Sequence, residues 1–260
     1  MRREMSVVGS FYPREAKDIL RYFNNFIALY DENTSLADVK TKAVIVPHAG
    51  YVFSGYTANI AYRILAKSGV KNFVVIGPSH RVAFDGVSMC ASAEYLTPFG
   101  PIAKSELIYE VLERNFGLSE KITHAEHSTE VQFPFIKHYM SDAKVVELVY
   151  GKESASSISK MIDLVLGLED CGVIISTDLS HFYNEEYANR LDNICIEAIQ
   201  KLDLSLLHQG CEACGILGVE AMMMSVKKEQ LEPILLDYRT SSDASGDESS
   251  VVGYMSACFV

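Results

Sequence analysis

Residues 42–55, KAVIVPHAGYVFSG, decide the fold. The run AVIV has the apolar character of a buried strand, and it stops at a proline that delivers His48 into a glycine-containing turn. The chain repeats this junction twice, in NFVVIGPSH, which ends at His80, and in CGVIISTDLSH, which carries Asp178 and His181. Three buried strands are therefore predicted to end in side chains that bind metals or move protons.

The rest of the chain alternates short apolar runs with segments of helical periodicity, a pattern that predicts an α/β fold with a mostly parallel central sheet covered by helices on both faces. No linker or repeat divides the chain, so we expect a single domain spanning residues 1–260, with the polar tract 240–250 as a loop inside it. The predicted strands are 43–46, 73–77, 144–150, 173–177, 232–241 and 251–260, and the predicted helices are 13–32, 54–69, 103–117, 128–140, 154–172, 184–203 and 215–230.

Parallel strands place their carboxyl ends at one edge of the sheet, where open α/β sheets bind ligands. His48, His80, Asp178 and His181 are therefore expected to converge there. On a helical turn, the three-residue spacing of Asp178 and His181 would put both on one face, so that Asp178 orients His181 or both address one substrate. The alternative is that Asp178 caps a following helix.

For the other candidate residues, the sequence pattern alone does not decide which of them belong to the site. In HAEHSTEVQFPF, spacing favours neither His124 nor His127, and the neighbouring glutamates are candidates to hold an imidazole tautomer. Cys211 and Cys214 form an isolated C-x-x-C, which leaves Cys214 as a single thiolate ligand or a buried thiol. Its position before a glycine and a helical pattern favours the thiolate, whereas the role of Cys211 stays open. The two remaining histidines are interpreted as surface residues: His138 and His208.

Composition narrows the classes of function. A net charge of −11 without clustered lysines and arginines argues against binding to nucleic acid or an anionic membrane. The chain has neither a signal peptide nor an apolar run of about 18 residues, so a soluble cytoplasmic protein is expected. Most of the six cysteines are expected to be reduced core residues, Cys171 and Cys195 in particular. Phosphate-binding glycine loops and the G-x-S-x-G motif are absent, which disfavours nucleotide binding and serine hydrolysis.

An ordered set of motifs makes the chain similar to the MEMO family, which includes the MEMO-domain proteins of the AmmeMemoRadiSam system. The motifs are VVGSFYP, VPHAGYVFSG, VIGPSHRVAFDG, EHSTEVQFPF, STDLSHF, CGILGVEAMM and SGDESSVVGYMSA. The resemblance implies a fold similar to class III extradiol ring-cleaving dioxygenases, which use Fe(II). It also implies a metal held by His48, His80 and Cys214, with Asp178, His181 and His127 as catalytic residues beside it.

The leading functional hypothesis is a metal-dependent oxidoreductase of unknown substrate, with Fe(II) as the preferred metal and copper or zinc as alternatives. A thiolate replaces the carboxylate of the Fe(II) oxygenases, so ring cleavage does not follow from the resemblance. A second hypothesis is a non-catalytic module that binds metal, a small molecule or a peptide. The resemblance suggests an AMMECR-type protein and a radical SAM enzyme as its partners. A zinc-dependent hydrolase is the third hypothesis.

Overall fold

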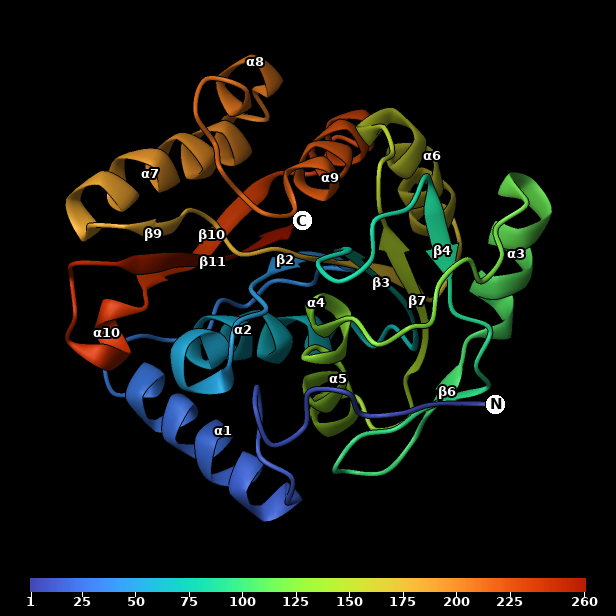
Figure 1. Cartoon of the computed structure of the whole chain (residues 1–260), viewed down its shortest axis with the longest axis horizontal. Coiled ribbons are helices and arrows are strands. Elements are labelled where there is room, and N and C mark those ends of the chain that lie inside the picture. Colours follow the sequence, from blue (N-terminus) through green and yellow to red (C-terminus); the bar gives the residue numbers. More distant parts are fainter.

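Successive residues of the central strands pack into two different hydrophobic cores. In the computed structural model, which describes residues 1–260, Ala43 and Ile45 face one core and Val44 and Val46 face the other. Because both faces of these strands are covered, their sequences are continuously apolar rather than alternating. Figure 1 shows the consequence, a twisted sheet between two layers of helices.

The sheet is mixed, with a parallel centre flanked by antiparallel pairs on both sides, and β1 pairs with β5 in parallel at one edge. Its order is β1-β5-β6-β7-β3-β8-β2-β11-β10, and the pairs joining β6, β7, β3, β8 and β2 are all parallel. Strands β11 and β10 continue one side in antiparallel fashion, while β4 pairs with β7 and β9 with β11. The strands are β1 (Arg2–Arg3), β2 (Ala43–Val46), β3 (Asn72–Pro78), β4 (Val87–Met89), β5 (Glu94–Tyr95), β6 (Ile102–Lys104), β7 (Lys144–Tyr150), β8 (Cys171–Ser176), β9 (His181–Tyr183), β10 (Pro233–Thr240) and β11 (Val251–Phe259).

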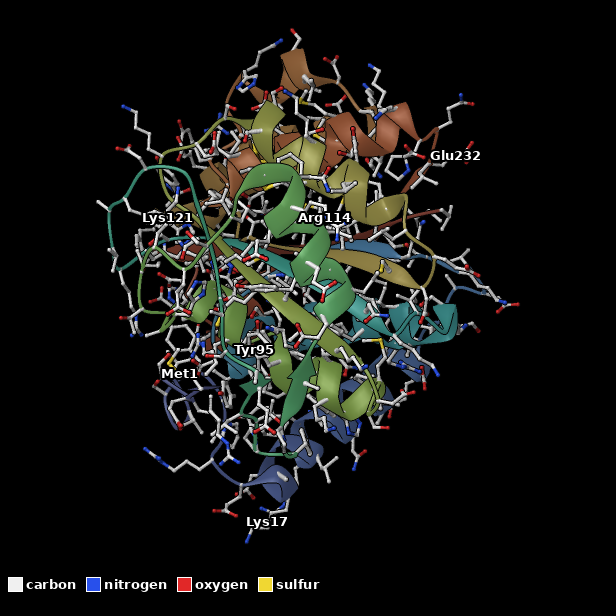
Figure 2. The ribbon with its side chains drawn as sticks, turned by 90° about the vertical axis from the view of Figure 1, so that its right-hand side faces the viewer. Met1, Lys17, Tyr95, Arg114, Lys121 and Glu232 are labelled. Atoms are coloured by element: carbon white, nitrogen blue, oxygen red, sulfur yellow. A yellow bond between two sulfur atoms is a disulfide. The ribbon has the colours of Figure 1, made fainter.

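Helices α1, α2 and α5 cover one face of the sheet, and α3, α6, α7, α8 and α9 cover the other (Figure 1). In Figure 2 the molecule is turned so that α3, which carries Arg114, lies in front of the sheet. The helices are α1 (Ala16–Asp31), α2 (Tyr51–Leu65) with its 3₁₀ extension Ala66–Ser68, α3 (Glu106–Phe116), α4 (His127–Glu130), α5 (Phe133–Tyr139), α6 (Ala155–Leu166), α7 (Glu185–Lys201), α8 (Leu204–Leu207), α9 (Ile216–Lys228) and α10 (Ser242–Ser245).

The α/β class is confirmed, whereas several local predictions are wrong. The helix predicted over 154–172 ends at Leu166, because a turn with Asp170 at φ 60° leads into β8. The single helix predicted over 128–140 is two short ones, α4 and α5. The segment from Asp178 to His181 is not helical: it has no regular secondary structure before β9 begins at His181, so Asp178 neither caps a helix nor shares a helical face with His181.

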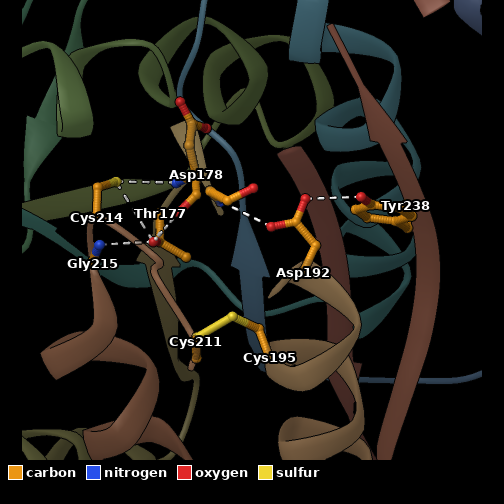
Figure 3. The surroundings of a disulfide bond; sticks show 9 residues. Thr177, Asp178, Asp192, Cys195, Cys211, Cys214, Gly215 and Tyr238 are labelled. Carbon is orange, nitrogen blue, oxygen red and sulfur yellow. Dashed lines mark hydrogen bonds between the residues drawn. A yellow bond between two sulfur atoms is a disulfide. The ribbon is translucent and has the colours of Figure 1, made fainter. Parts of the chain in front are cut away.

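The prediction that Cys195 is an ordinary reduced core residue is also wrong. Cys195 on α7 and Cys211 in the loop before α9 form a disulfide, with Cα atoms 4.8 Å apart (Figure 3). Their separation of 16 residues gave no sign of this contact, which depends on how α7 and α8 turn back on each other. Cys171 is a buried free thiol, as predicted. None of the helices is long and apolar enough to span a membrane.

A buried ion-pair network fixes the start of the chain to the middle of the sheet. Arg3 on β1 is paired with Glu130 of α4 and with Glu147 of β7, and all three side chains are at most 1% exposed. Glu130 also accepts hydrogen bonds from the backbone N–H of Ser6 and Val7. Although burial opposes it, the Arg3 guanidinium helps lower the pKa of Glu147 to about 2. Removing Arg3 would therefore leave two carboxylates buried without their cation.

We predict that Arg3→Met lowers the free energy of unfolding by about 3 to 5 kcal/mol, because breaking a buried ion pair leaves uncompensated charge. The neighbouring Arg2 provides a matched control: its pair with Glu94 is exposed, so Arg2→Met should cost no more than about 1 kcal/mol. Urea denaturation of both variants measures the difference. Equal costs would show that the network contributes nothing beyond a surface ion pair.

Candidate metal centre

Three ligand-type side chains meet at the carboxyl edge of the parallel strands. His48 follows β2 and His80 follows β3, and these two strands flank β8. Cys214 comes from the loop that precedes α9. Nε2 of His48 lies 3.4 Å from Nε2 of His80 and 3.3 Å from Sγ of Cys214. The expected convergence of the two histidines is therefore present, and Cys214 joins them.

These separations suit a shared metal ion. A tetrahedral ion with metal–nitrogen bonds of about 2.0–2.1 Å holds two ligand nitrogens about 3.3–3.4 Å apart. The two Nε2 atoms are 3.4 Å apart. Imidazole and thiolate together are ligands that iron, copper and zinc accept. The residues present therefore fit a metal of this class.

The tautomer of His48 is set by Ser176, the last residue of β8. The Ser176 hydroxyl donates its proton to the carbonyl oxygen of Ser128 and accepts a hydrogen bond of 2.8 Å from Nε2 of Gln132. Its contact of 3.0 Å with Nδ1 of His48 must then be one in which the imidazole donates. A neutral ring with its proton on Nδ1 presents the lone pair of Nε2 to His80 and Cys214.

His127 forms the wall of the site next to the ligands. Its ring centroid lies 5.4 Å from that of His48 and 4.9 Å from that of His80. Glu126 places both rings, because Oε1 lies 2.8 Å from Nδ1 of His127 and Oε2 accepts the backbone N–H of His80 at 2.8 Å. The structure thus distinguishes His127 from His124, whose ring lies in a separate cluster beside Glu147.

Asp178 and Cys214 are joined directly, as Figure 3 shows. The backbone N–H of Asp178 donates to Sγ of Cys214 at 3.3 Å, and the backbone N–H of Cys214 donates to the carbonyl oxygen of Asp178 at 3.1 Å. Gly215 permits this approach, since a Cβ there would lie 2.7 Å from Cβ of Thr177. Gly215 is therefore required for close packing against Thr177, and Cys214 supplies the thiol.

The Asp178 carboxylate faces His48 rather than His181. Oδ1 accepts the backbone N–H of His48 at 2.7 Å, and Oδ2 lies 4.0 Å from Nε2 of the same residue. The hypothesis that Asp178 orients His181 is wrong, because no hydrogen bond joins them and His181 leaves the turn as the first residue of β9. His181 is still close enough for its charge to lower the pKa of His48 and of His80.

Burial suppresses charge throughout the cluster. Desolvation, reinforced by neighbouring imidazoles, holds the pKa of His48 well below its ordinary value and also lowers the pKa of His80. Burial raises the pKa of Asp178 to about 7, and burial together with Asp178 raises the pKa of Cys214 to about 12. The thiolate expected from the helix N-terminus is therefore disfavoured in the metal-free pocket. A bound cation reverses these preferences, since a coordinating thiol is deprotonated.

Sequence reasoning missed the polar residues behind the ligands. Ser176 and Gln132 have no exposed surface, and their only signal was a polar side chain within an otherwise apolar segment. Of the histidines interpreted as surface residues, His208 is exposed, whereas His138 is half-buried with its ring 5.0 Å from that of Phe23. Cys211 does not assist Cys214 as a free thiol, because it is bonded to Cys195.

Comparisons with known proteins agree over nearly the whole chain. A family model described as "Memo-like protein" matches residues 3–258. A MEMO1 family protein of Thermoplasma acidophilum is 33% identical, covering 98% of each chain, and one of Methanobrevibacter smithii is 32% identical over 100% of each. The crystal structure of an uncharacterized protein from Escherichia coli K12 has a TM-score of 0.56 at 14% identity. That match covers 84% of this chain and 98% of the other, and it supports the α/β fold alone.

We predict that Ser176→Ala weakens metal binding about 10- to 100-fold, because the proton on His48 is no longer directed to Nδ1. Ser256→Ala is the matched control, since Ser256 is equally buried and its hydroxyl has no hydrogen-bond partner. Metal dissociation constants by competition with a chelator measure the effect. Equal affinity in the two variants would show that Ser176 does not prepare the ligand.

Proposed function

This chain belongs to the Memo-like protein family, and from that premise and the geometry of the strand ends we propose that it is a metal-dependent oxidoreductase. The family resemblance read from the sequence motifs is thereby confirmed. His48, His80 and Cys214 are the proposed ligands of a single transition-metal ion. The substrate class would be a small molecule that reaches this edge of the sheet.

One observation carries the proposal: three ligand-type atoms face one another at distances that a single metal ion can span. The Ser176 contact puts the His48 proton on Nδ1, so Nε2 of His48 offers a lone pair to His80 and to Cys214. Burial keeps these rings neutral. The His48 lone pair faces Nε2 of His80 at 3.4 Å and Sγ of Cys214 at 3.3 Å, so a cation between these atoms would be bound by all three residues.

The donor set accepts a redox-active metal. We propose Fe(II) first and copper or zinc as alternatives, because two imidazoles and one thiolate suit all three. A bound iron or copper ion would supply one-electron chemistry at coordination positions that the protein leaves open. Two imidazoles placed at one edge of a sheet by parallel strands are what a fold of the class III extradiol dioxygenase type would provide. Cys214 would take the place of the carboxylate, because Oδ2 of Asp178 lies 4.0 Å from Nε2 of His48.

The residues around the ligands have separate proposed roles. Asp178, with a pKa that burial raises to about 7, can exchange a proton at neutral pH at the oxygen that faces His48. His127 has its Nδ1 engaged by Glu126, so Nε2 is the atom that would contact a substrate or move a proton. His181, half-buried at the start of β9, would orient the substrate.

We predict that His48→Ala, His80→Ala and Cys214→Ala each bind one equivalent of metal fewer than the parent chain after anaerobic purification, since each removes a ligand. His208→Ala is the control, because His208 is exposed and pairs with Glu220 far from the strand ends. Elemental analysis gives the stoichiometry. Parent protein that stays metal-free after reconstitution with Fe(II), Cu(I) and Zn(II) would refute the site.

Oxygen consumption separates an oxidoreductase from a binding module. Iron-loaded or copper-loaded protein should consume O₂ with a reductant or substrate present, and the Cys214→Ala variant should not. Full metal loading without any oxygen consumption across a substrate screen would instead leave a protein that binds metal without redox turnover.

A further inference from the structure

A second group of ligand-type side chains lies outside the strand-end site. Cys90 directly follows β4, Glu147 lies in the middle of β7, and His124 belongs to the loop before α4. Their exposed fractions are 1%, 0% and 8%, and one ligand atom from each lies within 4.8 Å of the others. Pairing of β4 with β7 fixes two of them, because the backbone N–H of Cys90 donates to the carbonyl oxygen of Glu147 at 3.0 Å.

The charges beside this group do not balance. Arg3 is the cation paired with both Glu130 and Glu147, so one buried positive charge stands against two buried negative ones. Buried charges are stable only when they are compensated. One further cation beside Glu147 would neutralise the cluster, and it must be a proton on His124 or a bound metal ion.

The position of the His124 ring is compatible with the metal ion. Nδ1 is fully buried and lies 3.1 Å from Oε2 of Glu147, an ion-pair distance. Against the effect of burial, Arg3 and then His124 lower the pKa of Glu147, although the Nδ1–H direction is not well aligned with the carboxylate. An imidazolium paired with a carboxylate would direct its N–H along the contact. A nitrogen and an oxygen about 3 Å apart, without a well-aligned hydrogen bond between them, have the arrangement of two ligands of one metal ion. Ser88 Oγ lies 3.0 Å from Nε2 and accepts the backbone N–H groups of Lys121 and Ile122. A metal ion on Nδ1 requires the ring proton to lie on Nε2, facing this oxygen.

The cluster can be reached from solvent. Cys90 and His124 line a cavity of about 280 Å³, whose other walls include Met1, Ser92 and Glu120. Met1 marks this side of the molecule in Figure 2. The Cys90 thiol is free, and Arg3 and Thr129 both donate to the Glu147 carboxylate, as is usual for carboxylates that bind metals.

We propose that Cys90, His124 and Glu147 form a second metal site, which binds a borderline-soft divalent cation of the Zn(II) type independently of the strand-end site. One sulfur, one nitrogen and one oxygen ligand suit such an ion, and a water molecule from the cavity completes four-coordination. The bound ion joins β4, β7 and the loop before α4, and so stabilises the part of the fold that Arg3 also holds.

The test uses full-length Cys214→Ser protein, in which the strand-end site has lost its thiolate, with Co(II) and Zn(II) as probes. Co(II) should give the thiolate-to-cobalt absorption of one sulfur ligand, and Zn(II) absorption spectroscopy should show one sulfur at about 2.3 Å. Adding Cys90→Ser should abolish the Co(II) band and weaken Zn(II) binding at least 100-fold. The matched control is Cys258→Ser, which replaces another buried free cysteine and should leave both unchanged.

Two results would overturn the second site. The first is Cys214→Ser protein that binds neither ion, or binds Zn(II) without sulfur. The second is a Co(II) band that persists in the Cys214→Ser, Cys90→Ser double variant. The sulfur signal is measured in protein that retains Cys90, so it remains decisive even if the double variant folds poorly. Because every sample lacks Cys214, loss of the strand-end site does not affect the outcome.

Discussion

The parallel pairing of β2, β8 and β3 is the constraint on which the strand-end site depends. Val46 pairs with Ser176 and Ile76 with Ile175, so the three strands end at nearly the same level. The chain leaves each end with a polar side chain, and β8 lies between the other two. The two imidazoles therefore face each other across the end of β8, where the Ser176 hydroxyl is near enough to set the proton on His48. The register of the parallel strands, more than the structure of the loops, therefore places the two histidines.

The same constraint makes the pocket unfavourable for charge. Side chains at the ends of buried strands, and the Cys214 thiol packed against them, lose water on most sides. This burial raises the pKa of Cys214 and Asp178 and lowers the pKa of His48. Without a cation, the cluster consists of neutral groups with unused lone pairs. A bound cation offsets the cost of burying these groups, because it stabilises the thiolate, the carboxylate and the neutral imidazole by coordination.

Features encoded in local sequence were predictable, and features created by tertiary contacts were not. The apolar runs that become β2, β3 and β8 can be recognised in the sequence because both of their faces are buried. His48 follows β2 and His80 follows β3 within two residues. The motif resemblance supplied Cys214, which spacing alone had left undecided. The Cys195–Cys211 disulfide depends on how α7 and α8 pack, and the short strand β9 depends on pairing with β11, far along the chain. Local periodicity contains no information about such partners.

The helix α4 shows how distant parts of the chain place one catalytic candidate. It has four residues, His127–Glu130, too few for a helix to persist through its own hydrogen bonds. Each end is held from elsewhere: Ser128 donates to the carbonyl oxygen of Pro78 at the end of β3, Thr129 donates to Glu147 of β7, and Glu130 receives Arg3 of β1. The orientation of His127 towards His48 therefore rests on contacts from three strands. Since Glu147 also belongs to the second ligand group, α4 is the element that links the two candidate metal sites.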